Sequence, residues 1–383
     1  MITTIEQQQE QVCARCVLDT TVSDIRFDAN GECHYCKIHD ELEKVFPLNE
    51  QGQKQFHRLI EKIKQKGRKK DYDIIVGVSG GRDSTYALYI AVKLGLRPLA
   101  VHFDNGWNSE IAVTNIRNAT NKLNVDLQTY VADWEEFKDL QLSFLKASVS
   151  DAEIPTDVAI HSTLHRIAAE ENIAYVVFAH SFRTEGVAPL SWTYMDGKYI
   201  ESVQKKFGTK QLKTVPNMKL WDVFYYRFIK PVEVVPLLTW INYDQAQVDD
   251  LLKSELDWQY YGGHHHESYY THFFQSYYLP KKFNIDKRKI EYSALIRSGQ
   301  MNRESALAEI SSEEYPFDEE LVSYTKNKLG LSEEEFENIM SAPTKTFHDY
   351  PTYYPLIRWM KYPIKIASDW GIIPKHLYLK FLG

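Results

Sequence analysis

The chain has 383 residues, 44% of them hydrophobic and 25% charged, and its formal net charge is −7. This length is too great for one small core, so two or three structural units are expected. The acidic charge argues against nucleic acid as the main partner. The longest apolar runs are too short to cross a bilayer, and residues 1–12 lack the basic start and apolar stretch of a secretory signal. We therefore expect a cytoplasmic protein without membrane contact.

The cysteines come first along the chain, as two Cys-x-x-Cys pairs: Cys13, Cys16, Cys33 and Cys36. Two such pairs can supply four thiolates to one tetrahedral metal ion, most simply Zn²⁺. Asp28, Asn30 and Gly31 between the pairs predict a hairpin turn, as in a zinc ribbon. An iron–sulfur cluster would use the same ligands, although nothing in the spacing demands one. We predict a structural zinc site in a zinc-ribbon-like segment over residues 1–48.

This assignment limits the chemistry of the rest of the chain. If zinc uses all four thiols, no cysteine is left for covalent catalysis. The chain then carries neither a cysteine-dependent glutaminase of its own nor a persulfide-carrying cysteine. Residue 2 is Ile, which also excludes an N-terminal cysteine nucleophile. Any ammonia that the reaction needs must come from solution or from another protein.

A candidate anion site follows the first predicted strand. Residues 72–78 (YDIIVGV) are typical of a buried parallel strand, and a helix is predicted over residues 86–94. The loop between them consists of Ser79, Gly80, Gly81, Arg82, Asp83, Ser84 and Thr85. Its glycines let backbone N–H groups approach an anion, and its hydroxyl groups add donors. We expect Asp83 to hold a Mg²⁺ ion that bridges phosphate oxygens.

The loop has neither the Walker A spacing nor the Gly-x-Gly-x-x-Gly spacing. It resembles the PP-loop, Ser-Gly-Gly-x-Asp-Ser, of ATP pyrophosphatases such as asparagine, GMP and NAD synthetases and tRNA thiolases. The resemblance implies that ATP is cleaved between its α- and β-phosphates and that residues 79–85 hold the pyrophosphate.

The stretch around this loop predicts an α/β fold. Further strands are predicted over residues 98–103, 127–131 and 175–179, and helices over residues 109–123 and 157–171. This alternation favours a doubly wound, mostly parallel, Rossmann-like sheet, which we assign to residues 49–235. Ligands of such sheets bind at the carboxyl ends of the strands, so Asp104 and residues 180–186 become site candidates.

The PP-loop resemblance also suggests roles for these candidates. It implies that Asp104 contacts the adenosine and that Glu185 binds Mg²⁺ or substrate. Arg183 would steady a phosphate or a substrate carboxylate. A surface ion pair between Arg183 and Glu185 is equally compatible with the sequence.

From residue 236 the chain is predicted to be a helical region, rich in aromatic residues and histidine, that binds substrate or a partner. Consecutive histidines on a helix point in different directions, so residues 264–266 are not expected to share one metal ion. We predict instead a pocket that supplies donors to a charged substrate, with these candidates: His265, Glu267, Lys282, Lys287 and Arg288. The basic, aromatic residues 350–383 would pack on the protein body, dock a partner or lie on a membrane surface.

Nearly the whole chain resembles the bacterial N-acetyl sugar amidotransferases of surface-polysaccharide (LPS O-antigen) biosynthesis. The resemblance rests on the cysteine pairs, residues 78–85 and three blocks: YYGGHHHES, FFQSYYLPKKFNIDKRK and LIRSGQMNRESAL. Similar proteins tend to carry lysine where this chain has His264, which leaves the role of that one side chain open. The resemblance implies conversion of an acetamido group on a nucleotide-linked sugar to an acetamidino group. Ammonia would come from a separate glutaminase subunit, often accompanied by a cyclase-like subunit.

In the implied reaction, ATP transfers AMP to the acetamide oxygen, and ammonia then displaces the AMP. Glu185 and His265 are the candidates for a general base. One alternative is another ligase of this fold that amidates a carboxylate or a base. An RNA sulfur-transfer enzyme would need a catalytic thiol or cluster, and residues 157–171 contain no cysteine. A non-catalytic scaffold is disfavoured by the intact loop.

Overall fold

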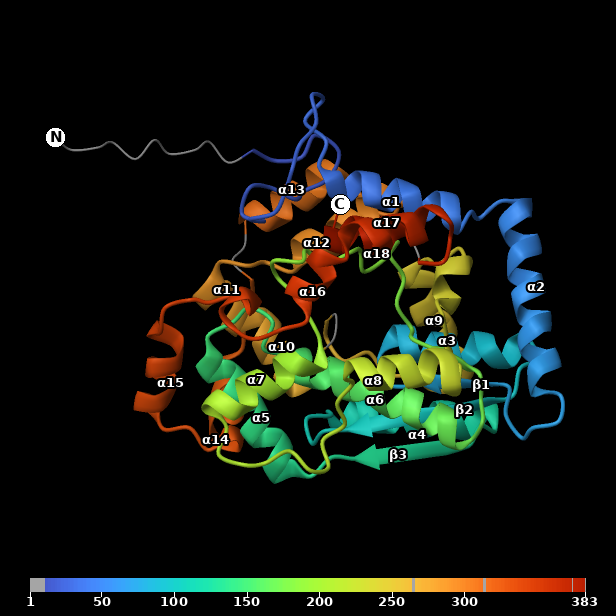
Figure 1. Ribbon diagram of the computed structural model, residues 1–383, viewed down its shortest axis with the longest axis horizontal. Coiled ribbons are helices and arrows are strands. Elements are labelled where there is room, and N and C mark those ends of the chain that lie inside the picture. Colours follow the sequence, from blue (N-terminus) through green and yellow to red (C-terminus); the bar gives the residue numbers. More distant parts are fainter. Residues whose placement is uncertain (1–10, 264–265, 313–314, 374, 383) are drawn as a thin grey trace.

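The computed structural model describes residues 11–263, 266–312, 315–373 and 375–382. Its centre is a five-stranded sheet with the strand order β3–β2–β1–β4–β5. The strands are β1 (Ile74–Gly77), β2 (Pro98–Asp104), β3 (Leu127–Val131), β4 (Tyr175–Val177) and β5 (Glu233–Val235). Every neighbouring pair is parallel. The sheet lies at the lower right of Figure 1, with helices around it.

The inner strands β1, β2 and β4 are buried on both faces, which explains why they are predominantly apolar. Ile74 and Val76 of β1 belong to one core cluster, whereas Ile75 belongs to another. Helices α3 (Arg82–Lys93) and α4 (Glu110–Leu123) cover the first face, and α6 (Ile154–Glu170) covers the second. Because successive strand residues point to opposite faces, this division confirms the doubly wound α/β fold.

The strand order places two loops next to each other. Strand β1 lies between β2 and β4, so the chain runs outward from β1 to β3 and then returns to the other side of β1. The loops after β1 and β4 therefore meet where the direction of winding reverses. This reversal point is the usual ligand-binding position of an open parallel sheet.

The predicted helix over residues 86–94 begins four residues earlier, at Arg82. Gly81 is the N-cap residue, with an extended φ of −72° and ψ of 165°. Asp83, Ser84 and Thr85 consequently lie in the first helical turn instead of in a loop. The N–H groups in the first turn of a helix have no partner within the helix, so the earlier start of α3 brings additional hydrogen-bond donors to the site.

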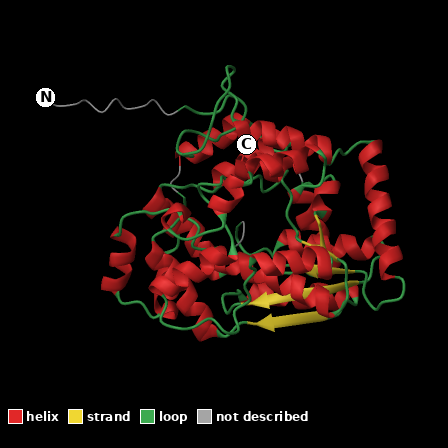
Figure 2. Cartoon of the chain, in the orientation of Figure 1, coloured by secondary structure: helices red, strands yellow, loops and turns green. Residues whose placement is uncertain are grey.

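Helices make up most of the remaining structure (Figure 2). They are α1 (His34–Val45), α2 (Glu50–Gly67), α5 (Trp134–Ala147), α7 (Gly197–Phe207), α8 (Leu220–Phe224), α9 (Gln245–Leu256), α10 (Tyr269–Phe273), α11 (Leu279–Phe283), α12 (Arg288–Arg297), α13 (Arg303–Ser312), α14 (Glu319–Leu329), α15 (Glu333–Ser341), α16 (Tyr354–Trp359), α17 (Lys361–Asp369) and α18 (Lys375–Leu382). None of the described helices has both the length and the apolar character of a membrane span.

Packing continues across the predicted boundary at residue 235. Leu252 of α9 and Trp258 lie in the same core cluster as β1 and α3. The segment after β5 therefore adds a layer outside α3, although the division of the chain into three units remains a prediction.

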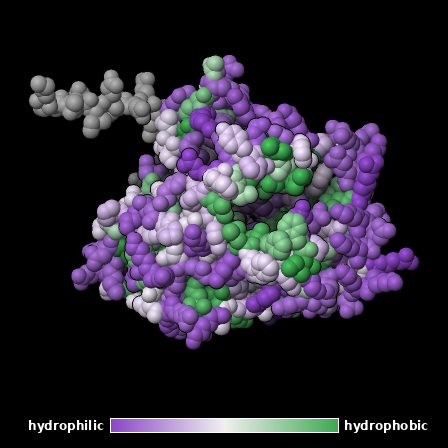
Figure 3. All heavy atoms as spheres, viewed as in Figure 1, coloured by the Kyte–Doolittle hydropathy of each residue, from purple (hydrophilic) through white to green (hydrophobic). Residues whose placement is uncertain are grey.

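The C-terminal helices pack against the beginning of the chain. Helix α18 contacts α1, and the two lie together at the top of Figure 1. Lys375 and Glu41 form an ion pair of 2.7 Å between them. Trp359 and Trp370 nevertheless remain 81% and 77% exposed. In Figure 3, hydrophobic residues gather around a hollow between α8 and the C-terminal helices. Docking of a partner by this segment remains a prediction.

Candidate functional site

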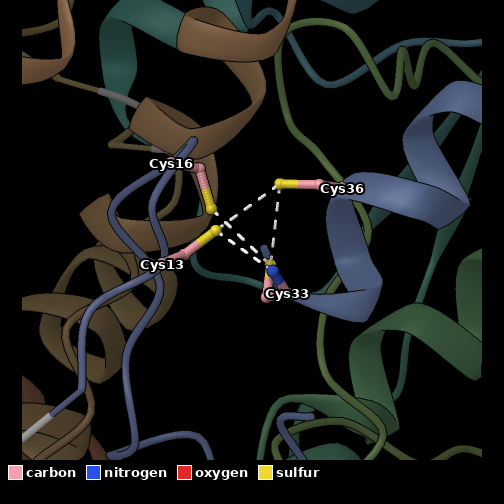
Figure 4. A group of neighbouring side chains, drawn as sticks. All are labelled: Cys13, Cys16, Cys33 and Cys36. Carbon is pink, nitrogen blue, oxygen red and sulfur yellow. Dashed lines mark hydrogen bonds between the residues drawn. The ribbon is translucent and has the colours of Figure 1, made fainter. Parts of the chain in front are cut away.

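The four cysteines form one compact group in the N-terminal segment (Figure 4). Their Sγ atoms are buried and lie within 4.8 Å of one another. The Cys13–Cys36 separation is 3.8 Å and the Cys16–Cys33 separation is 3.7 Å. A tetrahedral zinc ion with Zn–S bonds of about 2.3 Å sets its sulfur atoms about 3.8 Å apart. A cluster of several iron atoms needs more space between its thiolates, so the group fits a single zinc ion.

The hairpin predicted between the cysteine pairs is confirmed. Asp28 N–H donates to the Glu32 carbonyl at 3.0 Å, and Phe27 and Cys33 form an antiparallel bridge. Cys33 is then the N-cap of α1, so Cys36 lies in the first turn of that helix. The second cysteine pair is thus held by a hairpin on one side and by a helix on the other.

Two arginines attach the cysteine group to the C-terminal half. Arg297 donates to Cys16 Sγ at 3.1 Å and to Cys36 Sγ at 3.3 Å, and Arg303 donates to the Cys13 carbonyl at 2.7 Å. Burial alone would lower the pKa of Arg297, but the neighbouring sulfur atoms raise it. Both arginines come from the block LIRSGQMNRESAL, which therefore has a structural role that the sequence did not reveal.

A cavity of about 500 Å³ lies at the carboxyl ends of β1 and β4. Its walls come from several parts of the chain: the loop after β1, the end of β2 with the turn after it, helix α6, the loop after β4, Met195, Tyr261, and residues between 267 and 287. Among the lining residues are Ser79, Gly81, Arg82, Asp83, Ser84, Asp157, His161, His180, Glu185, Tyr261, Glu267, Gln275 and Lys287. The two loops predicted to form the site therefore share one cavity.

The loop after β1 directs its N–H groups at oxygen atoms. Ser79 N–H donates to Ser84 Oγ at 3.1 Å, and Gly81 N–H donates to Ser79 Oγ at 3.2 Å. Arg82 N–H donates to the Tyr261 hydroxyl at 3.1 Å. The Ser79 hydroxyl in turn donates to Glu267 Oε1 at 3.1 Å. These groups form a small concentration of donors at the positive end of α3.

Gly80 gives the loop its shape. Its φ is +82°, and an added Cβ would lie 2.2 Å from the Ala112 carbonyl oxygen. Only glycine satisfies both conditions at once. The Gly80 carbonyl accepts hydrogen bonds from Asn115 Nδ2 and Trp258 Nε1, both at 3.1 Å. The peptide after Gly80 is therefore held on two sides.

Residues after 235 stabilise the same loop. Tyr243 donates a hydrogen bond to Asp83, and Arg82 Nη2 donates to Asp249 Oδ2 at 2.9 Å. Trp258 and Tyr261, which bond to the Gly80 carbonyl and the Arg82 N–H, are the other two residues that hold the loop. Sequence reasoning missed all four residues, because no spacing pattern links a tyrosine or an aspartate to a loop more than 150 residues earlier.

Glu185 lies in the cavity beside a histidine. His180 Nδ1 and Glu185 Oε2 are 3.0 Å apart, and the two side chains are 55% and 14% exposed. Burial lowers the pKa of His180, but the Glu185 carboxylate outweighs it, so the pKa lies above the ordinary histidine value. The pair can hold a proton at the cavity wall. The predicted role of Glu185 in binding Mg²⁺ remains a prediction.

Three predicted site residues are engaged outside the cavity. Arg183 forms an ion pair of 2.6 Å with Glu43. Lys282 donates to the Ile339 and Ala342 carbonyls at the end of α15, at 2.6 and 2.7 Å. Arg288 is paired with Asp286 at 2.7 Å. None of the three lines the cavity, so the structure does not bring them together with the other predicted site residues.

The alternative of a surface pair between Arg183 and Glu185 was wrong. Residues 181–185 form a tight turn, in which the N–H groups of Thr184 and Glu185 both donate to the Ser181 carbonyl. Glu185 lines the cavity, while Arg183 is 5% exposed and reaches α1 instead.

Asp104, the predicted adenosine contact, accepts hydrogen bonds from Gly106 N–H at 2.8 Å and Asn108 Nδ2 at 3.0 Å. It shapes the turn after β2, and its neighbours His102 and Asn105 line the cavity instead. Gly80 and Thr85 are not among the residues that line the cavity. Glu267 and Lys287 do line it. His265 falls outside the described residues.

Residues 267–363 match the family described as "LPS biosynthesis protein WbpG-like, C-terminal domain". The chain carries a WbpG-like C-terminal domain. This match supports the predicted resemblance to proteins of surface-polysaccharide biosynthesis. The WbpG-like domain begins at Glu267, beside the loop after β1, and it contributes Gln275 and Lys287 to the cavity.

No curated protein sequence matches the chain. Among solved structures, NMN synthetase from Francisella tularensis is similar at 14% identity, over 76% of this chain and 98% of that one, with a TM-score of 0.32. NH3-dependent NAD synthetase from Campylobacter jejuni is similar at 14% identity, over 54% and 93%, with a TM-score of 0.27. U34-tRNA thiolase NcsA from Methanococcus maripaludis is similar at 16% identity, over 84% and 99%, with a TM-score of 0.29. The parallel sheet itself, and not these likenesses, defines the fold class.

Proposed function

We propose that the protein is an ATP-dependent amidotransferase of bacterial surface-glycan biosynthesis. Its substrate would be a nucleotide-linked N-acetyl sugar, whose acetamido group becomes an acetamidino group. The proposal rests on one observation: the Ser-Gly-Gly-x-Asp-Ser loop and the WbpG-like domain line the same cavity. A sugar precursor bound against that domain would lie directly beside a nucleotide held by the loop.

The loop suits the pyrophosphate part of ATP. The N–H groups of Ser79, Gly81 and Arg82 and two serine hydroxyls gather at the start of α3, where the helix dipole favours negative charge. In the proposal, phosphate oxygens take the place of the present oxygen partners. Donors fixed in advance stabilise the charge that develops on departing pyrophosphate.

Mg²⁺ would neutralise phosphate charge during this step. It binds through one or two carboxylates together with substrate phosphates and water. Asp83 and Glu185 both line the cavity and fit this requirement. Within the described residues the cysteines are the only close group of three or more metal ligands, so phosphate oxygens would complete the Mg²⁺ site.

Two steps account for the chemistry. The acetamide oxygen attacks the α-phosphorus, the bond between the α- and β-phosphates breaks, and an O-adenylyl imidate forms as pyrophosphate leaves. Ammonia then adds to the imidate carbon, AMP leaves, and a base receives the released proton. In the proposal, Glu185, which is paired with His180, would receive that proton. His265, the other predicted base, lies outside the described residues.

The ammonia would come from a separate glutaminase subunit, possibly accompanied by a cyclase-like subunit. All four cysteines of the chain belong to the N-terminal group, which leaves no thiol for glutamine hydrolysis here. We further propose that the reaction takes place in the cytoplasm, where ATP and nucleotide sugars are available.

Isotope labelling tests the proposal directly. The protein is incubated with ATP, Mg²⁺, ammonium and nucleotide-linked N-acetyl sugars whose acetamide oxygen is ¹⁸O. Mass spectrometry should find a product in which NH replaces O, and the ¹⁸O should appear in AMP because that oxygen attacks the α-phosphorus. Asp83→Asn should abolish both products, whereas Asp250→Asn, at a side chain 86% exposed on α9, should not.

Three results would overturn the proposal. One is formation of ADP instead of AMP. The second is AMP without ¹⁸O, since an O-adenylyl intermediate requires the transfer. The third is AMP formation with simple carboxylate acceptors and none with acetamido sugars, which would assign the chain to the other ligases of this fold.

A further inference from the structure

Arg183 lies in the turn that carries Glu185 into the cavity, and its own side chain reaches helix α1. Its Nε and Nη2 atoms donate to the two carboxylate oxygens of Glu43 at 2.7 and 2.6 Å. Nη2 also donates to the Phe46 carbonyl at 2.6 Å, and Nη1 donates to the Thr239 carbonyl. Arg183 is only 5% exposed, so these four hydrogen bonds join the turn firmly to α1 and to the chain after β5.

The Glu43 carboxylate is ionised throughout the neutral range. Burial raises its pKa, but hydrogen bonds from His39 and Arg183 outweigh burial and lower the pKa to about 2. A bidentate pair between a guanidinium and a carboxylate fixes direction as well as distance, which a single ammonium group cannot do. Desolvation of both charges offsets much of their attraction, so such a pair contributes more to orientation than to overall stability.

Helix α12 holds the same turn from another direction. Ser298, the C-cap residue of α12, donates through its Oγ to the Arg183 carbonyl at 2.8 Å. Gly186, which follows the turn, has a φ of +75°, and an added Cβ would lie 2.9 Å from Ile290 Cγ2. The turn is therefore in close contact with α12 both at its centre and at its end.

The two helices that hold the turn also contact the cysteine group. The second cysteine pair begins α1, and Cys36 lies about two helical turns before Glu43. Arg297, the neighbour of Ser298, donates to Cys36 Sγ at 3.3 Å. The cysteine group and the turn are therefore connected by two short routes, one through each helix, and both routes reach Arg183.

We propose that helix α1, anchored by the cysteine group, sets the position of Glu185 in the cavity, with Arg183 and Glu43 as positioning residues. This inference rests on the proposed function and deepens it, because Glu185 is there expected to bind Mg²⁺ or to receive a proton. The N–H groups of Thr184 and Glu185 both donate to the Ser181 carbonyl, so a shift of Arg183 would move the whole turn. The N-terminal segment would then support catalysis as well as folding.

His180 reports the position of Glu185 without any turnover. Its Nδ1 atom lies 3.0 Å from Glu185 Oε2. Burial lowers the pKa of His180, but the Glu185 carboxylate raises it above the ordinary histidine value, while Lys380 lowers it and Asp83 raises it to a smaller extent. A displaced Glu185 should therefore lower the pKa of His180. Nuclear magnetic resonance of ¹³C-labelled histidine measures this pKa, and the signal is identified by its absence in His180→Gln.

Glu43→Gln is the main variant, because it keeps the size of the side chain and removes the carboxylate that Arg183 binds. We expect kcat for AMP formation to fall by roughly tenfold to a hundredfold, with a smaller change in KM for ATP. The pKa of His180 should fall as well. Glu43→Asp keeps the charge on a shorter side chain and should recover part of both effects. Zinc content should stay at the wild-type level in both variants.

Asp40→Asn is the matched control on the same helix. Asp40 accepts two hydrogen bonds of 2.8 Å from the Arg15 guanidinium, so the variant removes an equivalent bidentate pair. That pair joins α1 to the residues between the first two cysteines and not to the turn. Both kcat and the pKa of His180 should remain at their wild-type values.

Ser298→Ala tests the contact from α12 and leaves the ion pair in place. It removes one hydrogen bond to the Arg183 carbonyl, so it should lower kcat and the pKa of His180 by smaller amounts than Glu43→Gln. If Glu43→Gln does not fold, the same two measurements on Ser298→Ala and Glu43→Asp take its place.

The inference would be wrong if the pKa of His180 stayed at the wild-type value in folded Glu43→Gln, or in the two variants that replace it. A kcat that these variants leave unchanged, or that Asp40→Asn lowers equally, would also overturn it. Because the resonance measurement needs no reaction, failure to form an amidine would count against the proposed function and not against this positioning role.

Discussion

The Tyr243 hydroxyl donates a hydrogen bond to the Asp83 carboxylate, and this contact joins residues 160 positions apart. Tyr243 is buried, and its ring stacks on Tyr86 with a centroid distance of 5.4 Å. The tyrosine therefore orients one oxygen of the residue that we expect to bind Mg²⁺.

Tyr243→Phe removes that donor and keeps the ring. We expect AMP formation to fall by roughly tenfold, because a hydrogen bond to a charged group contributes about 1.5 kcal/mol or more. The activity should be compared over a Mg²⁺ titration. Tyr86→Phe is the matched control, since Tyr86 packs against the same ring without bonding to Asp83. Equal losses in the two variants would show that the hydrogen bond to Asp83 is not the cause of the loss.

Gly80→Ala should abolish ATP binding. The change combines a left-handed backbone conformation with a contact of 2.2 Å between the new Cβ and the Ala112 carbonyl. Gly330→Ala is the control: its φ of +74° is similar, but no atom lies within 4 Å of the added Cβ. That variant should lose about 1 kcal/mol of stability and bind ATP normally. Normal ATP affinity in Gly80→Ala, measured by calorimetry, would contradict the loop geometry.

Cys33→Ser should lower the zinc content and the melting temperature together. The remaining three thiols cannot close a tetrahedral structural site, and metal binding contributes to folding. Elemental analysis and thermal unfolding measure the two effects, with Ser23→Ala as an exposed control in the same segment. If the wild-type protein contained iron and absorbed visible light, the four cysteines would hold an iron–sulfur cluster and not a zinc ion.

Asp151 should make stability depend on pH. It is buried and accepts a hydrogen bond of 2.8 Å from the Tyr199 hydroxyl. Burial raises its pKa from 3.8 to about 7. Asp151 therefore loses its proton at a lower pH in the unfolded chain than in the folded protein. Its contribution to stability is present below pH about 4 and is lost as the pH rises through about 7.

Asp151→Asn keeps the size of the side chain and removes its titration. The free energy of unfolding of the wild type relative to this variant should decrease across that range, on the order of 4 kcal/mol in total. Chemical denaturation at several pH values measures it. Asp250→Asn should show no such trend, and a flat difference for Asp151→Asn would mean that the carboxyl is ionised in the folded protein.

The sheet and the loop after β1 could be predicted because their signals are local. Ile74, Ile75 and Val76 form a buried strand through their own side chains, and Gly80 follows at once. The two Cys-x-x-Cys pairs likewise predict the four thiolate ligands of a metal site from the sequence alone. Strand β5 was not predicted, because it lies at the edge of the sheet and two of its three residues, Glu233 and Val234, are exposed, so it is not a buried apolar run.

Other parts of the site depend on contacts that sequence spacing does not encode. Tyr243, Trp258 and Tyr261 reach the loop through the packing of α9 on α3, which only the tertiary structure reveals. Arg183 appeared to belong to the site because it follows β4, but the turn at Ser181 sends it to Glu43.

Residues after β5 stabilise the loop after β1, and this limits where the chain can be truncated without disturbing that loop. A fragment that stops after β5 would keep every strand together with Gly80 and Asp83. It would lose three side chains: Trp258, which bonds to the Gly80 carbonyl, Tyr243, which bonds to Asp83, and Asp249, which pairs with Arg82. Such a fragment would retain the motif and all the strands, together with the Asn115 bond to the Gly80 carbonyl, but it would lose the contacts that hold the other side of the motif.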